Sequence, residues 1–235
     1  KAVGLKSADT ALSIIAVGGY GRATLAPGSD IDLLFLVPES KSAEVDKVVE
    51  FLLYALWDAR QKVGHATRTI EDCIALVKTD NTIMTSILEA RFICGNQTLF
   101  ADLIQRYRKG VVQKSAKQFV SEKLAERDQR HARYGESRYS VEPDIKDGKG
   151  GLRDLHTLFW IARCRYGFDR PQDYIDAGVF SADDWAAFQR AQEFLWTVRC
   201  HLHTIAGRAE ERLSFNVQPE LARRLGYRER RNQSR

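Results

Sequence analysis

The sequence lacks the features that mark disulfide-rich, zinc-bound or membrane-spanning proteins. Its 235 residues include only Cys73, Cys94, Cys164 and Cys200, and no two of them form a CxxC pair. Neither a disulfide framework nor a zinc site is indicated, so we expect a reducing, cytoplasmic setting. No apolar run approaches the roughly 20 residues of a spanning helix, and residues 1–9 lack the apolar core of a signal peptide. We therefore expect a soluble protein without a membrane partner.

A sustained basic surface is also missing, although the formal net charge is +5. Residues 208–235 carry 8 Lys/Arg against 4 Asp/Glu, whereas the rest of the chain is nearly balanced. A protein that follows a phosphate backbone needs a continuous basic face with aromatic side chains for stacking. The charge pattern therefore argues against nucleic acid as a partner.

The apolar content of 44% is sufficient for a hydrophobic core in one large domain or two ordinary ones. Residues 12–17 and 31–37 are short runs rich in branched apolar residues and bounded by glycine and proline, which is typical of buried strands. Residues 45–60 have apolar side chains at helical spacing and predict a helix that covers one face of the sheet. Residues 62–69 predict a third strand.

Helical signals dominate the rest of the chain. Thr69 with Asp72 resembles a capping box that opens a short helix. Asp80 is predicted to cap a second helix, over residues 80–95, which ends at Gly95. From residue 96 onward the strand signal disappears. The sequence therefore predicts an α+β fold, with a small mixed sheet and its helices over residues 1–110 and an all-helical domain over residues 111–235.

Two carboxylates stand where the second strand begins. Asp30 and Asp32 are two residues apart, so in a strand their side chains point to the same face, where they repel each other unless a cation lies between them. Carboxylates are hard ligands that prefer Mg²⁺ or Mn²⁺ to zinc. The alternative is a turn followed by a solvated strand end, but Asp32 is flanked by apolar residues, where an unpaired charge is unfavourable.

The glycine pair between the two strands indicates an anion site. It is not a P-loop, since no Gly-Lys-Ser/Thr follows, and it fails the dinucleotide fingerprint because Thr24 stands at the third glycine position. Gly18 and Gly19 allow backbone N–H groups to approach a phosphate closely, with Arg22 and Ser29 as nearby donors. The alternative is a tight turn without a ligand.

These motifs together resemble a known superfamily. A glycine pair, the eleven-residue step from Gly19 to Asp30 and the following Asp-Ile-Asp on an apolar strand are similar to the signature of polymerase-β-type nucleotidyltransferases. Within that superfamily, residues 18–36, 142–154 and 194–210 resemble motifs of the PII uridylyltransferases. The resemblance spans nearly the whole chain.

The resemblance implies the fold of a polymerase-β-like nucleotidyltransferase domain, followed by a helical domain. It implies transfer of UMP from UTP to a tyrosine hydroxyl of the PII nitrogen-signalling protein, with Mg²⁺ or Mn²⁺ on Asp30 and Asp32 and the triphosphate on Gly18 and Gly19. The superfamily has a third carboxylate on a later strand. Residues 62–69 contain none, so Glu89 is the candidate for this third catalytic position.

A glycine-rich connection precedes residue 152 and carries three cations. Lys146, Lys149 and Arg153 are candidate contacts to the nucleotide phosphates, in a loop that closes over the ligand. The alternative is a connection between two helices without a ligand.

Full-length members of the family add a metal-dependent HD hydrolase domain that removes UMP and ACT domains that sense glutamine. The chain has no His-Asp doublet, so we expect an amino-terminal fragment that transfers UMP but does not remove it. Two alternatives stay open, namely an adenylyl-transferring enzyme of the same fold and a non-catalytic module that binds a nucleotide or a partner. The sequence gives no oligomeric state.

Overall fold

The computed structural model describes residues 12–38, 43–134, 140–168 and 170–228. Their contacts divide the chain into two compact units. The sheet unit comprises Lys1–Leu25 and Ser29–Lys117, and the helical unit comprises Ala26–Gly28 and Gln118–Arg235. The sequence predicted a boundary at residue 110, which lies within the helical passage that leads from one unit to the other.

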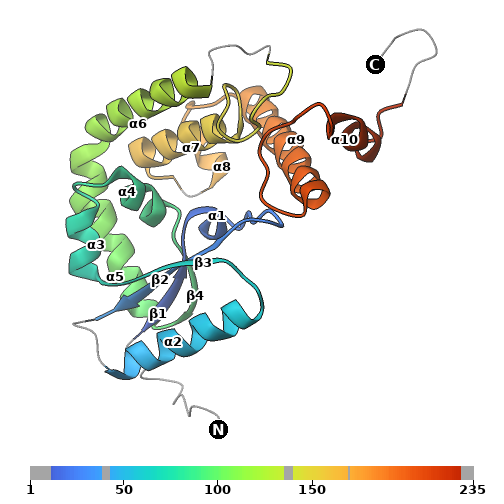
Figure 1. Ribbon diagram of the computed structural model, residues 1–235. Helices are drawn as coiled ribbons and strands as arrows, with labels where there is room; N and C mark the ends of the chain where they lie inside the picture. The colour runs from blue at the N-terminus through green and yellow to red at the C-terminus, as the bar shows by residue number, and fades with distance from the viewer. Residues whose placement is uncertain (1–11, 39–42, 135–139, 169, 229–235) are drawn as a thin grey trace. The chain divides into compact units, whose positions relative to one another are not determined.

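The sheet unit is built on a four-stranded mixed sheet with the strand order β3-β2-β1-β4 (Figure 1). β1 is Ser13–Ala16, β2 is Ile31–Val37, β3 is Val63–Thr69 and β4 is Arg91–Gly95. β2 pairs in parallel with β3, while β1 pairs antiparallel with both β2 and β4. The first three strands confirm the predicted ones, and the mixed sheet confirms the predicted α+β class.

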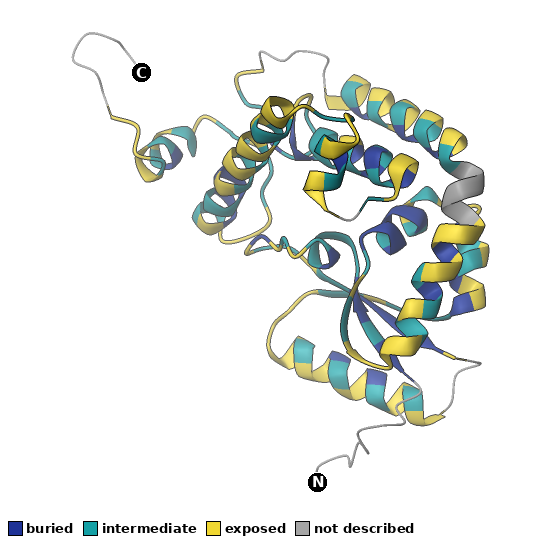
Figure 2. Ribbon diagram, turned by 180° about the vertical axis from the view of Figure 1, so that it is seen from behind, coloured by how far each residue is buried: buried dark blue, intermediate teal, exposed yellow. Residues whose placement is uncertain are grey.

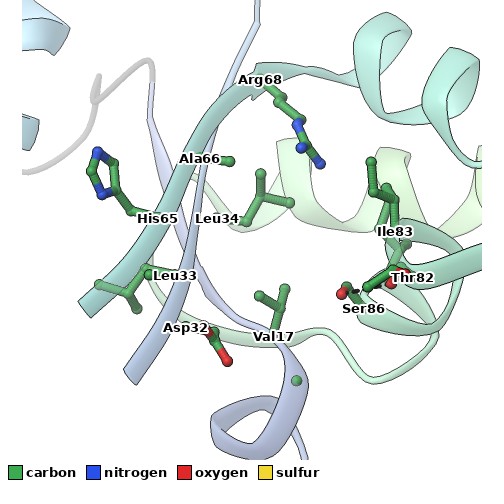
Figure 3. Close-up of a pocket in the computed structure, with 13 residues that line it drawn as sticks. Val17, Asp32, Leu33, Leu34, His65, Ala66, Arg68, Thr82, Ile83 and Ser86 are labelled. Carbon is green, nitrogen blue, oxygen red and sulfur yellow. Dashed lines mark hydrogen bonds between the residues drawn. The ribbon is translucent and has the colours of Figure 1, made fainter. Parts of the chain in front are cut away.

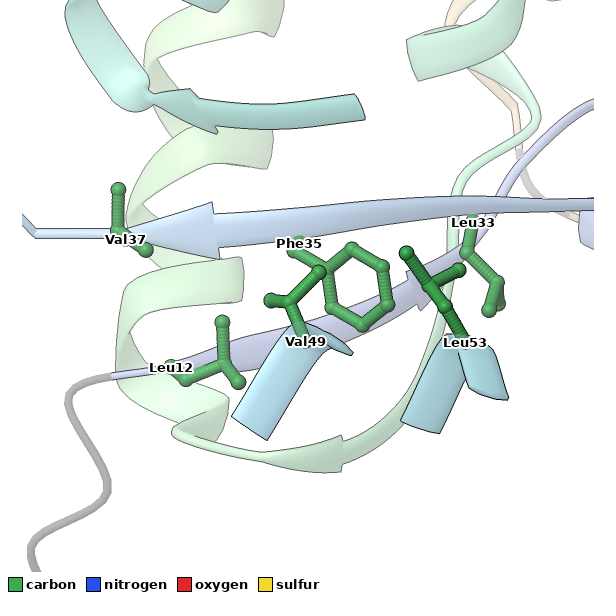
Figure 4. Packing of buried hydrophobic residues seen from close by; sticks show 6 residues of the cluster. All are labelled: Leu12, Leu33, Phe35, Val37, Val49 and Leu53. Atoms are coloured by element: carbon green, nitrogen blue, oxygen red, sulfur yellow. The ribbon is translucent and has the colours of Figure 1, made fainter. Parts of the chain in front are cut away.

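Helix α2, Ala43–Asp58, covers one face of this sheet. Buried and exposed residues alternate along it at helical spacing (Figure 2). The apolar stripe of α2 and the strand residues that point to the same face form one buried cluster (Figure 4), whose members are Leu12, Leu33, Phe35, Val37, Val49 and Leu53. The predicted amphipathic helix is confirmed.

The helices that follow β3 begin at the predicted caps. The capping box of Thr69 and Asp72 opens α3, Ile70–Leu76, and the Asp80 side chain accepts backbone N–H groups at the start of α4, Asn81–Leu88. α5, Gln97–Tyr107, packs against β1 and β2, and its Tyr107 hydroxyl donates to the carbonyl of Met84 in α4. These side chains satisfy backbone groups that helix ends leave without partners.

The predicted helix over residues 80–95 is wrong in its second half. α4 ends at Leu88, and β4 follows and pairs with β1. The spacing of apolar residues in so short a segment does not distinguish a strand from a helical turn. Residues 91–95 form a strand because β1 offers them backbone hydrogen-bond partners along its free edge. Gly95, predicted to end the helix, has a φ of +99°. A Cβ there would lie 2.2 Å from the Leu12 carbonyl oxygen, so glycine is required for close strand pairing.

The helical passage between the units contains an irregular turn. α5 continues into a π-helical segment, Arg108–Val112, and then into α6, Gln113–Tyr134. Gly110 lies inside the π-helical segment. Extra-wide turns of this kind interrupt the regular hydrogen-bond ladder.

The helical unit continues with four further helices, which are α7 (Leu152–Tyr166), α8 (Pro171–Asp176), α9 (Ala182–Ala206) and α10 (Gln218–Arg224). Its described residues contain no strand beyond an isolated bridge between Asp144 and Arg212. One buried cluster joins the loop before α7 to α9 and α10, through Ile145, Val198, Leu202 and Leu221. In the described parts of the chain, no helix has the length and apolarity needed to cross a membrane.

The packing of α2 can be tested with a matched pair of truncations. Leu53 is 4% exposed in the core, whereas Phe51 on the same helix is 62% exposed. We expect Leu53→Ala to lower the free energy of unfolding by about 2–5 kcal/mol, because it leaves a cavity, and Phe51→Ala to change it by less than about 1 kcal/mol. Urea denaturation followed by circular dichroism measures both. Equal losses would contradict the assigned orientation of α2.

Candidate active site

A pocket opens in the sheet unit where the β1–α1 turn, β2, β3 and α4 meet (Figure 3). Its volume is about 310 Å³. The short helix α1, Gly18–Gly21, follows β1 directly, and its first glycine lines the pocket. Asp32 faces the cavity from β2, while Thr82 and Ser86 line it from α4. The pocket therefore joins two of the motifs that the sequence singled out.

Asp32 is held between two glycines. A Cβ on Gly18 would lie 3.0 Å from Oδ2 of Asp32, and a Cβ on Gly64 would lie 2.5 Å from Oδ1. Gly64 is the register partner of Asp32 in the parallel β2–β3 pair. Gly18 has a φ of +57°, a backbone conformation that favours glycine. The carboxylate therefore occupies space that any larger residue at these positions would take.

The surroundings of Asp32 favour a bound cation. Burial raises the pKa of its carboxyl group, and the nearby charge of Asp30 raises it further, whereas Arg22 lowers it. A divalent cation would offset both unfavourable contributions to the charged form. Two carboxylates are also a donor set that Mg²⁺ or Mn²⁺ accepts, with substrate phosphates and water as the remaining ligands. The residues present fit such a metal.

Glu89, the candidate for the third catalytic position, pairs with an arginine. Both oxygens of Glu89 accept hydrogen bonds from Nη1 of Arg22, at 2.7 and 2.6 Å, and the Glu89 side chain is 2% exposed. Among the described residues, no group of three or more Asp, Glu, His or Cys side chains is arranged to hold a metal. The Glu89 carboxylate thus pairs with Arg22, and its assignment as the third catalytic carboxylate stays a prediction.

The Arg22 side chain, a predicted phosphate contact, is paired with Glu89. Its Nη1 is committed to Glu89, while its buried Nε has no hydrogen-bond partner. Gly21 explains the close packing, since a Cβ there would lie 2.4 Å from the Glu89 carbonyl oxygen. The predicted phosphate contacts of Gly19, Arg22 and Ser29 stay predictions.

Two residues that sequence reasoning missed lie on β3. Gly64 and Arg68 line the pocket, and the Arg68 guanidinium points into it (Figure 3). The register pairs Asp32 with Gly64 and Leu36 with Arg68, so these side chains share one face of the sheet. The sequence held a partial signal for these two residues. Side chains alternate between faces along a strand, so Gly64 and Arg68 share a face, but only the pairing of β3 with β2 shows that Asp32 lies on it too.

The three cations of the glycine-rich connection do not converge in the helical unit. Lys146 Nζ lies 3.8 Å from Oε1 of Glu211, and Arg153 donates to Asp147. Lys149 is exposed and borders a second pocket of about 510 Å³ beside α6 and α7. Their predicted contacts to nucleotide phosphates stay predictions.

A glycine turn followed by Asp30 just before β2 and Asp32 within it, on a small mixed sheet, is typical of a nucleotidyltransferase domain. Residues 4–91 match the sequence model described as "Nucleotidyltransferase domain". Residues 118–235 match the model described as "GlnD PII-uridylyltransferase". The chain belongs to the GlnD PII-uridylyltransferase family.

Individual relatives agree with this family. Proteins named "Bifunctional uridylyltransferase/uridylyl-removing enzyme" from Rhodospirillum rubrum, Caulobacter vibrioides and Rhodopseudomonas palustris are 54%, 57% and 51% identical to the chain. The matches cover 93%, 92% and 94% of this chain and 23%, 23% and 24% of those proteins. The chain therefore spans about a quarter of the length of the curated relatives it matches.

The role of Gly64 can be tested by adding one methyl group. We expect Gly64→Ala to weaken Mn²⁺ binding by about tenfold or more, because the new Cβ would displace the Asp32 carboxylate. Electron paramagnetic resonance of free Mn²⁺ measures the affinity. Gly110→Ala is the control, since a Cβ at Gly110 meets no atom within 4 Å. Unchanged Mn²⁺ affinity in folded Gly64→Ala would contradict the placement of Asp32.

Substitution of Glu89 tests whether its carboxylate is part of a structural ion pair or is a metal ligand. We expect Glu89→Gln to lower the free energy of unfolding by about 2–4 kcal/mol, because Arg22 would lose its charged partner in a largely buried position. Mn²⁺ affinity should stay within about twofold of wild type. Glu71→Gln is the control, because its pair with Arg106 is exposed and should contribute less than about 1 kcal/mol. A large loss of Mn²⁺ affinity in Glu89→Gln would support Glu89 as a metal ligand instead.

Proposed function

We propose that this chain transfers UMP from UTP to a tyrosine hydroxyl of the PII signalling protein and releases pyrophosphate. The observation that carries the proposal is the Asp32 carboxylate, lodged between Gly18 and Gly64 at the edge of the pocket. Membership of the GlnD PII-uridylyltransferase family supports uridylyl transfer over other reactions of the same fold. The relatives' printed names support the same activity.

In this reaction the tyrosine oxygen forms a bond to the α-phosphorus of UTP, and the bond between that phosphorus and the bridging oxygen to the β-phosphate breaks. Pyrophosphate leaves with the electron pair, and the tyrosine proton passes to solvent. Mg²⁺ or Mn²⁺ held by Asp30 and Asp32 supplies charge neutralisation for the triphosphate when bound. The protein's own contribution is mainly positioning and electrostatic stabilisation.

Each pocket residue has a defined task in this proposal. Asp32 is closely flanked by Gly18 and Gly64, and its carboxylate would bind the cation from this position. Gly18 leaves the space above Asp32 open to the triphosphate. Arg68 points into the same pocket and offsets charge on the phosphates. Arg22, oriented by its pair with Glu89, lies near enough to Asp32 to lower the pKa of that carboxyl group.

We also propose that the protein works in the cytoplasm. Cys73, Cys94, Cys164 and Cys200 are all free thiols, as in proteins of reducing compartments. Burial raises the pKa of Cys73 and of Cys164 to about 11, so both stay protonated and unreactive at neutral pH.

The activity is tested by mass spectrometry of PII after incubation with this chain, UTP and Mg²⁺. We expect the mass of PII to increase by one uridylyl group. Asp32→Asn should lower the rate of this modification by at least about 100-fold, because one metal-binding charge is removed. Asp46→Asn on the exposed surface of α2 is the control and should keep wild-type rates.

The same reaction with ATP, CTP or GTP in place of UTP tests base selectivity. Preference for ATP would support an adenylyl-transferring enzyme instead. Unmodified PII in the presence of folded wild-type chain would contradict catalysis by this chain and leave a nucleotide-binding or partner-binding module.

A further inference from the structure

The pocket of the helical unit is lined by α6, by α7 and by the loop that leads into α7 (Figure 1). Its volume is about 510 Å³, and all the residues that line it lie between positions 124 and 161. The helical unit includes Gln118–Arg235, so this pocket is formed within one compact unit. The proposed transfer of UMP is carried by residues of the sheet unit, which leaves this pocket without a task.

One wall of the pocket is apolar. Leu124 of α6 lines it together with Leu158 and Ile161 of α7. Leu158 and Ile161 are three residues apart, so their side chains lie on the same face of α7. Leu158 is 43% exposed. Apolar side chains that gather around a cavity with a few charged groups are typical of small-molecule sites.

Two cations also line the pocket, one from α6 and one from the loop. Lys149 is exposed, and among the described residues it has no ion-pair partner. Arg127 donates through Nε and Nη2 to Oδ1 of Asp128, at 2.9 and 2.8 Å. The Asp128 side chain is 65% exposed, and exposed pairs of this kind contribute little stability. Arg127 can therefore exchange this partner for a ligand at small cost.

The carboxylate of Asp154 lines the same pocket, but its charge is already compensated. It accepts hydrogen bonds from Nη2 of Arg130, from Nε2 of His131 at 2.9 Å and from the Gly150 N–H at 2.8 Å. Burial alone would raise the pKa of Asp154, but these hydrogen bonds hold it below its usual value. Asp154 therefore ties the loop to α6 and leaves the charges of Arg127 and Lys149 for a ligand.

The loop that carries Lys149 is held by its own backbone hydrogen bonds. The N–H of Gly148 donates to the carbonyl of Asp144 at 3.1 Å, and the N–H of Gly151 donates to the carbonyl of Gly148 at 2.9 Å. A Cβ on Gly148 would lie 2.4 Å from the Asp144 carbonyl oxygen, so the turn has no room for a larger residue. The backbone on both sides of Lys149 is thus fixed, which lowers the ordering cost of binding a ligand.

Two cations beside an apolar wall match one class of ligand. A phosphate monoester carries a charge of about −1.5 to −2 at pH 7, so it balances two cations, whereas a carboxylate balances one. An arginine fork and a lysine ammonium are both common phosphate contacts in proteins. The organic part of the ester would cover the apolar wall.

We propose that the pocket of the helical unit binds a small phosphate monoester, with the phosphate at Arg127 and Lys149 and the organic part against Leu124, Leu158 and Ile161. A nucleoside monophosphate and an ester without a base share this chemistry. The inference goes beyond the transfer of UMP, because it involves neither the metal pair nor the sheet unit.

Isothermal titration calorimetry of the whole chain tests the proposal, with EDTA present to exclude divalent metals. We expect phenyl phosphate to bind with a Kd below about 1 mM. Inorganic phosphate, which lacks the apolar part, and benzoate, which has a single charge, should each bind at least about tenfold more weakly.

Substitutions locate the bound ester. Lys149→Gln and Arg127→Gln should each weaken phenyl phosphate binding by about 5- to 50-fold, because each removes a charge-assisted hydrogen bond. Leu158→Glu should weaken it as much, because it places a negative charge in the apolar wall. Arg133→Gln is the control and should stay within about twofold of wild type, since Arg133 is exposed on α6 and lies about 240° around the helix from Arg127.

UMP in the same titrations identifies the source of the phosphate. Tighter binding of UMP than of phenyl phosphate, weakened by Lys149→Gln, would support the site and make a nucleotide its ligand. Weaker binding of UMP would support an ester without a base.

Three outcomes overturn the inference. They are equal affinities for benzoate and phenyl phosphate, wild-type affinity in folded Lys149→Gln and Arg127→Gln, and no binding of phenyl phosphate by the folded wild-type chain. Transfer of UMP to PII by a chain that binds no phenyl phosphate would reject this site and keep the proposed function. Binding of phenyl phosphate that depends on Lys149, by a chain that transfers no UMP, would support the site and reject the proposed function.

Discussion

The proposed site in the sheet unit depends on the space that two glycines leave for the Asp32 carboxylate. Asp32 lies near the start of a strand whose alternate residues, Leu33, Phe35 and Val37, build the core beneath α2. Its oxygens fit only because Gly18 and Gly64 have no side chains. Burial and the charge of Asp30 make the ionised carboxylate unfavourable unless a cation is present. Packing and electrostatics together thus favour a metal at this edge of the sheet.

Charge pairing elsewhere supports the same arrangement. Glu89, just after α4, neutralises Arg22, just after α1, and the Gly21 backbone lies against the same turn. In the helical unit Glu211 pairs with Arg199 beside the buried His203. Each pair is largely shielded from water, where removing one member leaves an uncompensated charge. The intact pair adds little net stability, because the cost of removing both charges from water offsets their attraction.

The sequence predicted those elements whose signals are local. The first three strands, α2 and the caps at Thr69 and Asp80 were found because apolar periodicity and capping chemistry act over a few neighbouring residues. β4 was missed because its pairing partner, β1, lies far back in the chain. The pairing of Glu89 with Arg22 was missed for the same reason, since the two residues are distant in sequence. Long-range pairing leaves no short-range pattern.

By itself the sequence determined the class of fold, the aspartate pair, the glycine turn and the resemblance to a family. Only the tertiary structure decided what each of these residues contacts. It placed Gly64 and Arg68 on the face of Asp32, because the parallel register of β2 and β3 sets which side chains are neighbours. It also brought His203 to Gly28, which are separated by most of the chain. Contacts of this kind follow from packing whole elements together, and no local sequence pattern contains that information.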